Sequence, residues 1–188
     1  MGKIVVTEFV SLDGVMEDPG GAEDFRYGGW TFEIERGEGD TFKMEETMAT
    51  DALLLGRVTY EGFAQAWPER EGEFADKFNS MPKYVVSSTL KDPEWTNTTV
   101  LGGDLAQDVA RIKAAHDGDI AVHGSAQLAQ ELIERDLVDE LHLMQFPVIL
   151  GSGKRLIDST SDKKPLRLTD SKIVGDGVAI LVYEPRSA

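Results

Sequence analysis

Apolar positions recur along the chain with two alternating periods. Short β-branched or leucine-rich runs bounded by turn residues predict strands at 3–10, 52–55, 83–87, 98–101, 119–122, 139–146, 165–174 and 178–183. Apolar residues three and four positions apart predict helices at 40–50, 59–66 and 71–80, and around 105–112 and 128–133. Strands that alternate with helices in this way are typical of an α/β domain.

The last two predicted strands flank Gly175-Asp176-Gly177, which suits a hairpin turn. We therefore expect a central, mostly parallel mixed sheet with a C-terminal antiparallel hairpin and helices on both faces. No internal repeat, low-complexity tract or long linker divides the pattern, so residues 1–188 are expected to form a single domain.

Composition narrows the class of protein. Of the 188 residues, 41% are hydrophobic, which favours a packed core over disorder. The absence of cysteine excludes disulfides, thiolate metal sites and cysteine nucleophiles. A net charge of -15 argues against nucleic acids and anionic membranes as partners. Met1-Gly2-Lys3 leads straight into a strand without the features of a signal peptide, and no apolar run approaches a membrane span, so we expect a cytoplasmic location.

Three predicted strands end in residues that suit a bound anion. These ends are Gly56-Arg57-Val58-Thr59, Ser87-Ser88-Thr89 and His123-Gly124-Ser125-Ala126. Open α/β sheets bind ligands at the carboxyl ends of strands, where a glycine lets a phosphate approach the N-terminus of the next helix. Arg57 adds a guanidinium suited to a phosphate monoester, and the hydroxyl groups add short donors. The three ends together predict a polyphosphate site.

Each of these features also has an ordinary structural interpretation. Gly56 and Gly124 are equally consistent with tight strand-to-helix packing, and Arg57 with a surface ion pair. Ser87-Ser88 is consistent with capping at a strand end. Their joint occurrence at three strand ends is what favours a ligand site.

Other motifs with known chemistry are incomplete. The chain has no G-x-G-x-x-G, and Gly151-Ser152-Gly153-Lys154 lacks the first glycine and the final Ser or Thr of a phosphate-binding P-loop. The three histidines lack the spacing of metal ligands, so no metal site is expected. His123 is more simply a packing residue at a strand end than a base.

A family resemblance follows from motifs spread over nearly the whole chain. Phe9-Val10-Ser11-Leu12-Asp13-Gly14-Val15 resembles the first strand and loop of the reductase domain in riboflavin-biosynthesis deaminase–reductases. Leu55-Gly56-Arg57-Val58-Thr59 is similar to the Gly-Arg-x-Thr element that this family shares with dihydrofolate reductases. Segments 84–89, 122–128, 137–141 and 147–153 resemble further blocks of the family in the same order. Stand-alone bacterial members without a deaminase domain are the most similar.

The resemblance implies a dihydrofolate-reductase-like fold and hydride transfer from NADPH. It implies that Arg57, Thr59, Ser87 and Ser88 lie along the cofactor, with Gly56 beside them, and that Gly124, Ser125 and Ala126 meet its pyrophosphate. It also implies that the backbone at Phe9 and Val10 faces the nicotinamide, and that the protein is a homodimer. His123 and Ser125 stand where the family's pyrophosphate element is usually richer in glycine.

The sequence offers several candidates for the proton donor and the substrate contacts. Dihydrofolate reductases bind the pterin ring with a helix carboxylate, and Asp40 falls near that position, although it would also serve as a helix N-cap. Asp13 is a second candidate and would equally hold a turn at Gly14. Glu8 is a third, unless it points to solvent. Trp30, at the end of the long loop 17–31, would stack on a flat ring or merely anchor the loop.

The sequence thus favours an NADPH-dependent reductase, similar to dihydrofolate reductase and to 5-amino-6-(5-phosphoribosylamino)uracil reductase. Its substrate would be a small pteridine-like or pyrimidine-like heterocycle. The alternative is a nucleotide-binding protein of the same fold without redox turnover, because no proton donor stands out. The resemblance implies the fold and the cofactor, and it narrows the substrate to this class of heterocycle.

Overall fold

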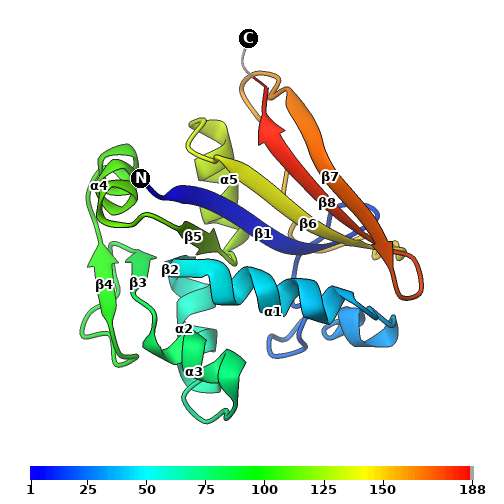
Figure 1. Cartoon of the computed structure of the whole chain (residues 1–188), viewed down its shortest axis with the longest axis horizontal. Coiled ribbons are helices and arrows are strands. Elements are labelled where there is room, and N and C mark those ends of the chain that lie inside the picture. Colours follow the sequence, from blue (N-terminus) through cyan, green and yellow to red (C-terminus); the bar gives the residue numbers. More distant parts are fainter. Residues whose placement is uncertain (187–188) are drawn as a thin grey trace.

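The computed structural model describes residues 1–186, in which eight strands form one sheet. The strands are β1 (Lys3–Ser11), β2 (Thr50–Gly56), β3 (Lys83–Val86), β4 (Thr98–Leu101), β5 (Asp119–Val122), β6 (Glu140–Phe146), β7 (Leu166–Val174) and β8 (Val178–Pro185). Their order across the sheet is β4-β3-β2-β5-β1-β6-β8-β7. The pairs from β4 to β6 are parallel, and β8 joins β6 and β7 by antiparallel pairing. The predicted mostly parallel sheet with its C-terminal hairpin is confirmed (Figure 1).

Helices cover both faces of this sheet. They are α1 (Gly39–Ala49), α2 (Arg57–Ala66), α3 (Glu73–Ser80), α4 (Leu105–Ala115) and α5 (Ala126–Glu134), and a short 3-10 helix, η1 (Trp30–Glu33), precedes α1. Figure 1 shows α1 in front of the strands and α5 behind them. All five α-helices were expected from the apolar spacing, whereas η1 lies at the end of a segment expected to be a loop.

Alternating side chains of the central strands fill a core on each face. In β2, Leu54 joins the apolar cluster under α4 and α5, while Leu53 and Leu55 join the cluster under α2 and α3. A third cluster, centred on Phe146 and Trp30, lies beyond α1 toward the hairpin. This two-sided burial explains why the central strands are continuous apolar runs rather than alternating ones.

The outer hairpin is much less covered than the centre. Eight of the nine residues of β7 are exposed, so both faces of this edge strand are open. Leu166, Leu168 and Ile173 are among them, with Ile173 at 67% exposure. Within residues 1–186, no helix combines the length and apolar character needed to cross a membrane.

Candidate functional site

The sheet has a switch in its winding between the neighbouring strands β2 and β5. The chain leaves β2 into α2, which packs with the cluster on one face, and leaves β5 into α5, which packs on the other face. Two helices that diverge in this way leave a crevice at the carboxyl ends of the strands, and open α/β sheets bind ligands there. The N-termini of α2 and α5 flank this crevice.

Neither of these two helices satisfies its own first turn with a side chain. The N-cap residues are Gly56 for α2 and Ser125 for α5, and neither makes a side-chain capping bond. No acidic residue lies in either first turn. The N-terminus of α4 differs, because Asp104 accepts a bond from the Gln107 amide at 3.0 Å. The free N–H groups and positive dipole ends of α2 and α5 therefore favour an anion between them.

A groove of about 490 Å³ crosses these strand ends. It is lined by Gly56, Arg57, Val58, Val86, Ser87, Ser88, Thr89, Leu101, Gly102, Gly103, Leu105, Ser125, Gln127, Leu128 and Glu131. The three strand ends singled out in the sequence thus contribute to one concave surface. Gly102 and Gly103, which follow β4, were missed, although a Gly-Gly pair directly after a strand carries the same signal as Gly56.

Two glycines make the crevice tight. A Cβ on Gly56 would collide with the Ser125 side chain, and a Cβ on Gly124, whose φ is +93°, would lie 2.9 Å from the Thr59 hydroxyl. The Gly56 amide donates to the Gly124 carbonyl at 3.2 Å. Both glycines therefore have the packing role that was one of their two interpretations, and they also bring the groove close to bare backbone. Gly124, Thr59 and Ala126 adjoin the lining rather than forming it.

Arg57 already holds a partner on the rim of the groove. Its guanidinium donates to both carboxylate oxygens of Glu61, at 3.0 and 2.9 Å, and its side chain is 44% exposed. An exposed pair of this kind is worth at most about 1 kcal/mol, so a phosphate can compete for the guanidinium. Ser87 caps its own turn by accepting from the Thr89 and Leu90 amides, and Ser88 is exposed.

Strand β1 parts from β5 beside this crevice. Their parallel pairing ends at Val6–Val122, although β1 continues to Ser11 in partnership with β6 on its other side. The backbone of β1 at Phe9 and Val10 therefore has no paired strand on the β5 side. The side chains point away into packed regions, with the Phe9 ring edge-on to Phe146 at 5.7 Å and Val10 only 3% exposed.

A mostly buried polar group of four residues lies between α1 and the sheet. We call Thr7, Lys43, Glu46 and His142 the α1 cluster. Glu46 accepts from the Lys43 ammonium at 2.6 Å and from the Thr7 hydroxyl at 2.9 Å, and it lies 2.7 Å from His142 Nδ1. The Lys43 ammonium also donates to Thr7 at 2.6 Å. The carboxylate of α1 that faces the sheet is therefore Glu46 rather than Asp40.

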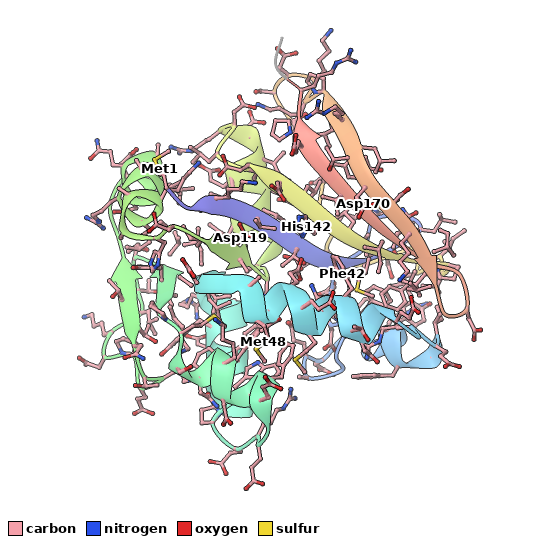
Figure 2. The ribbon with its side chains drawn as sticks, in the orientation of Figure 1. Met1, Phe42, Met48, Asp119, His142 and Asp170 are labelled. Atoms are coloured by element: carbon pink, nitrogen blue, oxygen red, sulfur yellow. The ribbon has the colours of Figure 1, made fainter. Side chains whose placement is uncertain are left out.

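The α1 cluster reaches the surface through Glu140. His142 Nε2 lies 2.9 Å from Glu140, whose other oxygen accepts from Lys3 at 2.5 Å. Figure 2 shows His142 on the strands beside α1, with Phe42 nearby; the two rings are 6.3 Å apart. Burial alone would lower the pKa of His142, but the carboxylates on both sides raise it. Burial opposes ionisation of Glu46, yet Lys43 and His142 hold its pKa well below the usual range.

The three residues expected on the substrate side make other contacts. Asp40 is the second residue of α1 rather than its cap, is 66% exposed and pairs with Arg36 at 3.0 Å. Trp30 is 2% exposed, donates its indole N–H to the Glu17 carbonyl and packs edge-on to Phe146. These contacts match the interpretation of Trp30 as an anchor of the loop.

Asp13 holds the loop after β1 against the segment after β6. Its carboxylate accepts from the Ser11 hydroxyl at 2.7 Å and from the amides of Leu150 and Gly151 at 3.1 and 2.9 Å. These bonds, with Ser11 the strongest, lower the pKa of Asp13 to about 2. A carboxylate held this firmly in its ionised form is a poor proton donor at neutral pH. The catalytic roles of Asp13 and Asp40 stay predictions.

His123 packs among aromatic rings at the end of β5. Its ring centre lies 6.4 Å from that of Phe63 and 5.6 Å from that of Phe78. Burial lowers its pKa to about 3, so the ring is neutral at physiological pH. This agrees with its interpretation as a packing residue.

The groove has the features that a dinucleotide phosphate would need. Uncapped helix N-termini supply backbone donors on two sides, and bare glycines allow close approach. Arg57 supplies the charge at one end, and the unpaired stretch of β1 lies toward the other. The residues present therefore fit the cofactor that the sequence resemblance implies.

Comparison with known proteins gives a matching family model and two similar bacterial proteins. Residues 2–182 match the family model of the RibD C-terminal domain. The chain is 28% identical over 178 residues to the uncharacterized protein YwjB of Bacillus subtilis, covering 95% of each chain. It is 27% identical over 186 residues to YyaP of the same species, covering 96% of this chain and 94% of YyaP.

Solved structures share the fold at low identity. A Shewanella sp. PV-4 protein named for riboflavin biosynthesis has a TM-score of 0.79 at 22% identity, covering 98% of this chain and 99% of its own. Dihydrofolate reductase of Enterococcus faecalis, solved with NADP(H), has a TM-score of 0.60 at 14% identity, and the match covers 99% of this chain and 98% of that reductase. A pyrimidine reductase-like protein of Corynebacterium diphtheriae has a TM-score of 0.62 at 13% identity, and the match covers 100% of this chain and 93% of that protein. The chain has a dihydrofolate-reductase-like fold and belongs to the RibD C-terminal domain family.

Proposed function

We propose that this protein is an NADPH-dependent reductase that transfers hydride to a small pteridine-like or pyrimidine-like heterocycle. The observation that carries the proposal is the groove at the uncapped N-termini of α2 and α5, with Arg57 on its rim. A nicotinamide cofactor supplies the hydride chemistry when bound, so the protein needs mainly to position the reactants.

In this proposal the ribose phosphate of NADPH takes Arg57 from Glu61. The guanidinium offers two parallel N–H groups, which match a phosphate monoester, and Ser87 and Ser88 lie on the same wall of the groove. The pyrophosphate lies at Gly124, Ser125 and Ala126, where the first turn of α5 presents its amides. The remaining part of the cofactor then points to the open edge of β1 at Phe9 and Val10.

The substrate in this proposal lies on the α1 side of the same strands. The α1 cluster lies beside β1 there, and in this proposal its ammonium and carboxylate exchange their bonds to one another for bonds to a polar heterocycle. Glu46 is a further carboxylate of α1 that suits a substrate contact, because its side chain is 9% exposed and faces the sheet, whereas Asp40 is 66% exposed and pairs with Arg36.

Fluorescence titration with NADPH and NADH tests the cofactor. We expect saturable quenching of tryptophan by both, with tighter binding of NADPH. Arg57→Ala should weaken NADPH about 10- to 100-fold and leave NADH nearly unchanged, because a charge-assisted pair is worth roughly 1.5–3 kcal/mol. Arg111→Ala is the matched control, since Arg111 is also an exposed helix arginine, paired with Asp108 away from the groove.

The outcomes separate the two functions considered. Absence of saturable binding of either dinucleotide by the wild type would reject the proposal. Equal losses for NADPH and NADH in Arg57→Ala would reject the placement of the ribose phosphate. Oxidation of NADPH with dihydrofolate, pterins or the pyrimidine intermediate of riboflavin synthesis supports a reductase. Binding without turnover of any of them supports a nucleotide-binding protein, an alternative motivated by the engaged carboxylates of Asp13 and Asp40.

We further propose that the protein acts as a cytoplasmic homodimer. The exposed edge strand β7 carries Leu166, Leu168 and Ile173 in the open, and free edges of this kind are commonly covered by another chain. Light scattering of the wild type and of Leu168→Lys tests this, with a dimer expected for the first and a weaker one for the second. A monomeric wild type would reject it.

A further inference from the structure

A single carboxyl interrupts an apolar row on strand β1. Alternate residues of β1 point to the same face, and on that face Ile4, Val6 and Val10 belong to the cluster under α4 and α5. Glu8 occupies the third of the four places in this row and is only 9% exposed. Its Oε1 is buried without a hydrogen-bond partner among the described residues. A valine would fill this position without that cost, so the carboxyl needs an explanation.

Glu8 lies where β1 and β5 separate. The last paired residues are Val6 and Val122, so Glu8 falls beside Gly124, two residues further along each strand. The Gly124 backbone amide lies close enough to lower the pKa of the Glu8 carboxyl. Gly124 begins the turn into α5, which is one wall of the groove. By register, Glu8 therefore lies between the end of β5, from which the wall of the groove begins, and the open edge of β1 at Phe9.

The charges around Glu8 leave it protonated at neutral pH. Burial is the largest influence and raises the pKa of Glu8 to about 8. Lys43 of α1 and the Gly124 amide oppose this rise, whereas Glu46 of α1 adds to it. His123, the neighbour at the end of β5, is neutral because burial lowers its pKa to about 3. Glu8 thus presents both a hydroxyl donor and a carbonyl acceptor.

A nicotinamide ring has complementary groups. Its carboxamide offers a carbonyl acceptor and an NH₂ donor, which match the two functions of a neutral carboxylic acid. The ring is uncharged when reduced and carries a positive charge when oxidised. A neutral Glu8 therefore suits the reduced ring, and a carboxylate suits the oxidised ring.

We propose that Glu8 binds the nicotinamide carboxamide in the gap between β1 and β5, and that it releases its proton to water when the oxidised, positively charged ring is bound. This inference rests on the proposed function, because it takes the cofactor from there. No bond other than the O–H bond of Glu8 breaks, and the proton passes to solvent. Glu8 is in this view a specificity-determining residue, which favours one oxidation state of the cofactor over the other as pH changes.

Binding measurements test the contact without any substrate. The probes are NADPH and adenosine 2′,5′-bisphosphate, which keeps the ribose phosphate but lacks the nicotinamide. Glu8→Ala should weaken NADPH about tenfold or more and leave the bisphosphate unchanged. Glu8→Gln, which keeps a donor and an acceptor, should hold NADPH within about threefold of the wild type. Retained bisphosphate binding shows that each variant is folded.

The number of protons released on cofactor binding tests whether Glu8 loses its proton beside the oxidised ring. Calorimetry of NADP⁺ and NADPH binding in two buffers of different ionisation enthalpy, at about pH 7, measures the protons released. The two cofactors carry the same phosphates, so the difference between their proton release reports on the nicotinamide ring alone. We expect NADP⁺ to release about one proton more than NADPH in the wild type and in Glu45→Gln, an exposed control on α1. Glu8→Gln should abolish this difference.

Each result has one meaning. Equal proton release by NADP⁺ and NADPH in the wild type overturns the inference, and so does an equal loss of NADPH and bisphosphate binding in Glu8→Ala. In both cases wild-type NADPH binding leaves the proposed function standing. A wild type that binds neither probe overturns the proposed function, and this inference with it.

Discussion

Two polar regions of the molecule, the groove at the strand ends and the α1 cluster, are built in opposite ways. The groove at α2 and α5 has few charges, and its donors are backbone amides that no side chain caps. The α1 cluster is dense in charges, and each of its members has partners at 2.6–2.9 Å. The first region has unused hydrogen-bonding capacity, whereas the second satisfies itself. In an acidic protein, unpaired donors rather than surplus basic residues mark the place for an anionic ligand.

The largest expected effect comes from removing the centre of the α1 cluster. Glu46→Ala leaves the Lys43 ammonium, only 12% exposed, without its carboxylate and removes one partner of His142. We expect a loss of about 3–5 kcal/mol in the free energy of unfolding, measured by urea denaturation, because an uncompensated buried charge remains. Glu45→Ala on the exposed side of the same helix should change it by less than about 0.5 kcal/mol. Equal effects of both variants would show that the cluster contributes no more than the surface.

Glu8 makes the free energy of unfolding fall as pH rises. Its pKa rises from 4.5 in the unfolded chain to about 8 in the fold, so the fold binds the proton more tightly. The stabilisation is therefore complete below pH 4.5 and is lost as pH rises through about 8. The difference in unfolding free energy between wild type and Glu8→Gln should fall by roughly 1 kcal/mol per pH unit between about pH 5 and 8. Urea denaturation across this range measures it, and parallel pH profiles would contradict it.

The fold and the groove were predictable because their signals are local. Buried strands produce continuous apolar runs, and the residues after Leu55 and Val86 follow directly from those runs. Parallel strands then bring their carboxyl ends to one edge, so separate motifs meet without further information. Arg57 was placed on the groove for this reason, and its Glu61 partner is also readable as a pair four residues apart.

The α1 cluster was not predictable in the same way. Lys43 and Glu46 lie three residues apart and read in sequence as an ordinary surface pair. Only the packing of α1 over the sheet brings His142 within 2.7 Å of Glu46, across 96 residues of chain. Glu8 did leave a signal, because it stands inside a run of buried residues, but a strand's sequence alone does not show whether both faces are covered.

The capped and uncapped helices offer a smaller test of the same contrast. Asp104→Ala should destabilise the fold by about 1 kcal/mol, since it removes the bond to the Gln107 amide at the start of α4. Ser125→Ala should cost little stability, because the Ser125 side chain makes no capping bond for α5. Thermal unfolding compares the two variants. A larger loss in Ser125→Ala would mean that α5 is capped in solution and is less suited to bind an anion.

The smallest effect concerns the competition for Arg57. Glu61→Gln removes the carboxylate that holds the guanidinium at 2.9–3.0 Å and leaves Arg57 itself intact. NADPH should then bind about two- to fivefold more tightly, because the exposed pair that it must displace is worth only about 0.2–1 kcal/mol. Fluorescence titration at low and high salt measures the change, which should shrink as salt screens the pair. Glu131 also lines the groove but has its ion pair with Arg135, so Glu131→Gln is the matched control. If both variants strengthen NADPH binding equally, the gain reflects the general negative field of the groove, and Arg57 then has no privileged contact with the ribose phosphate.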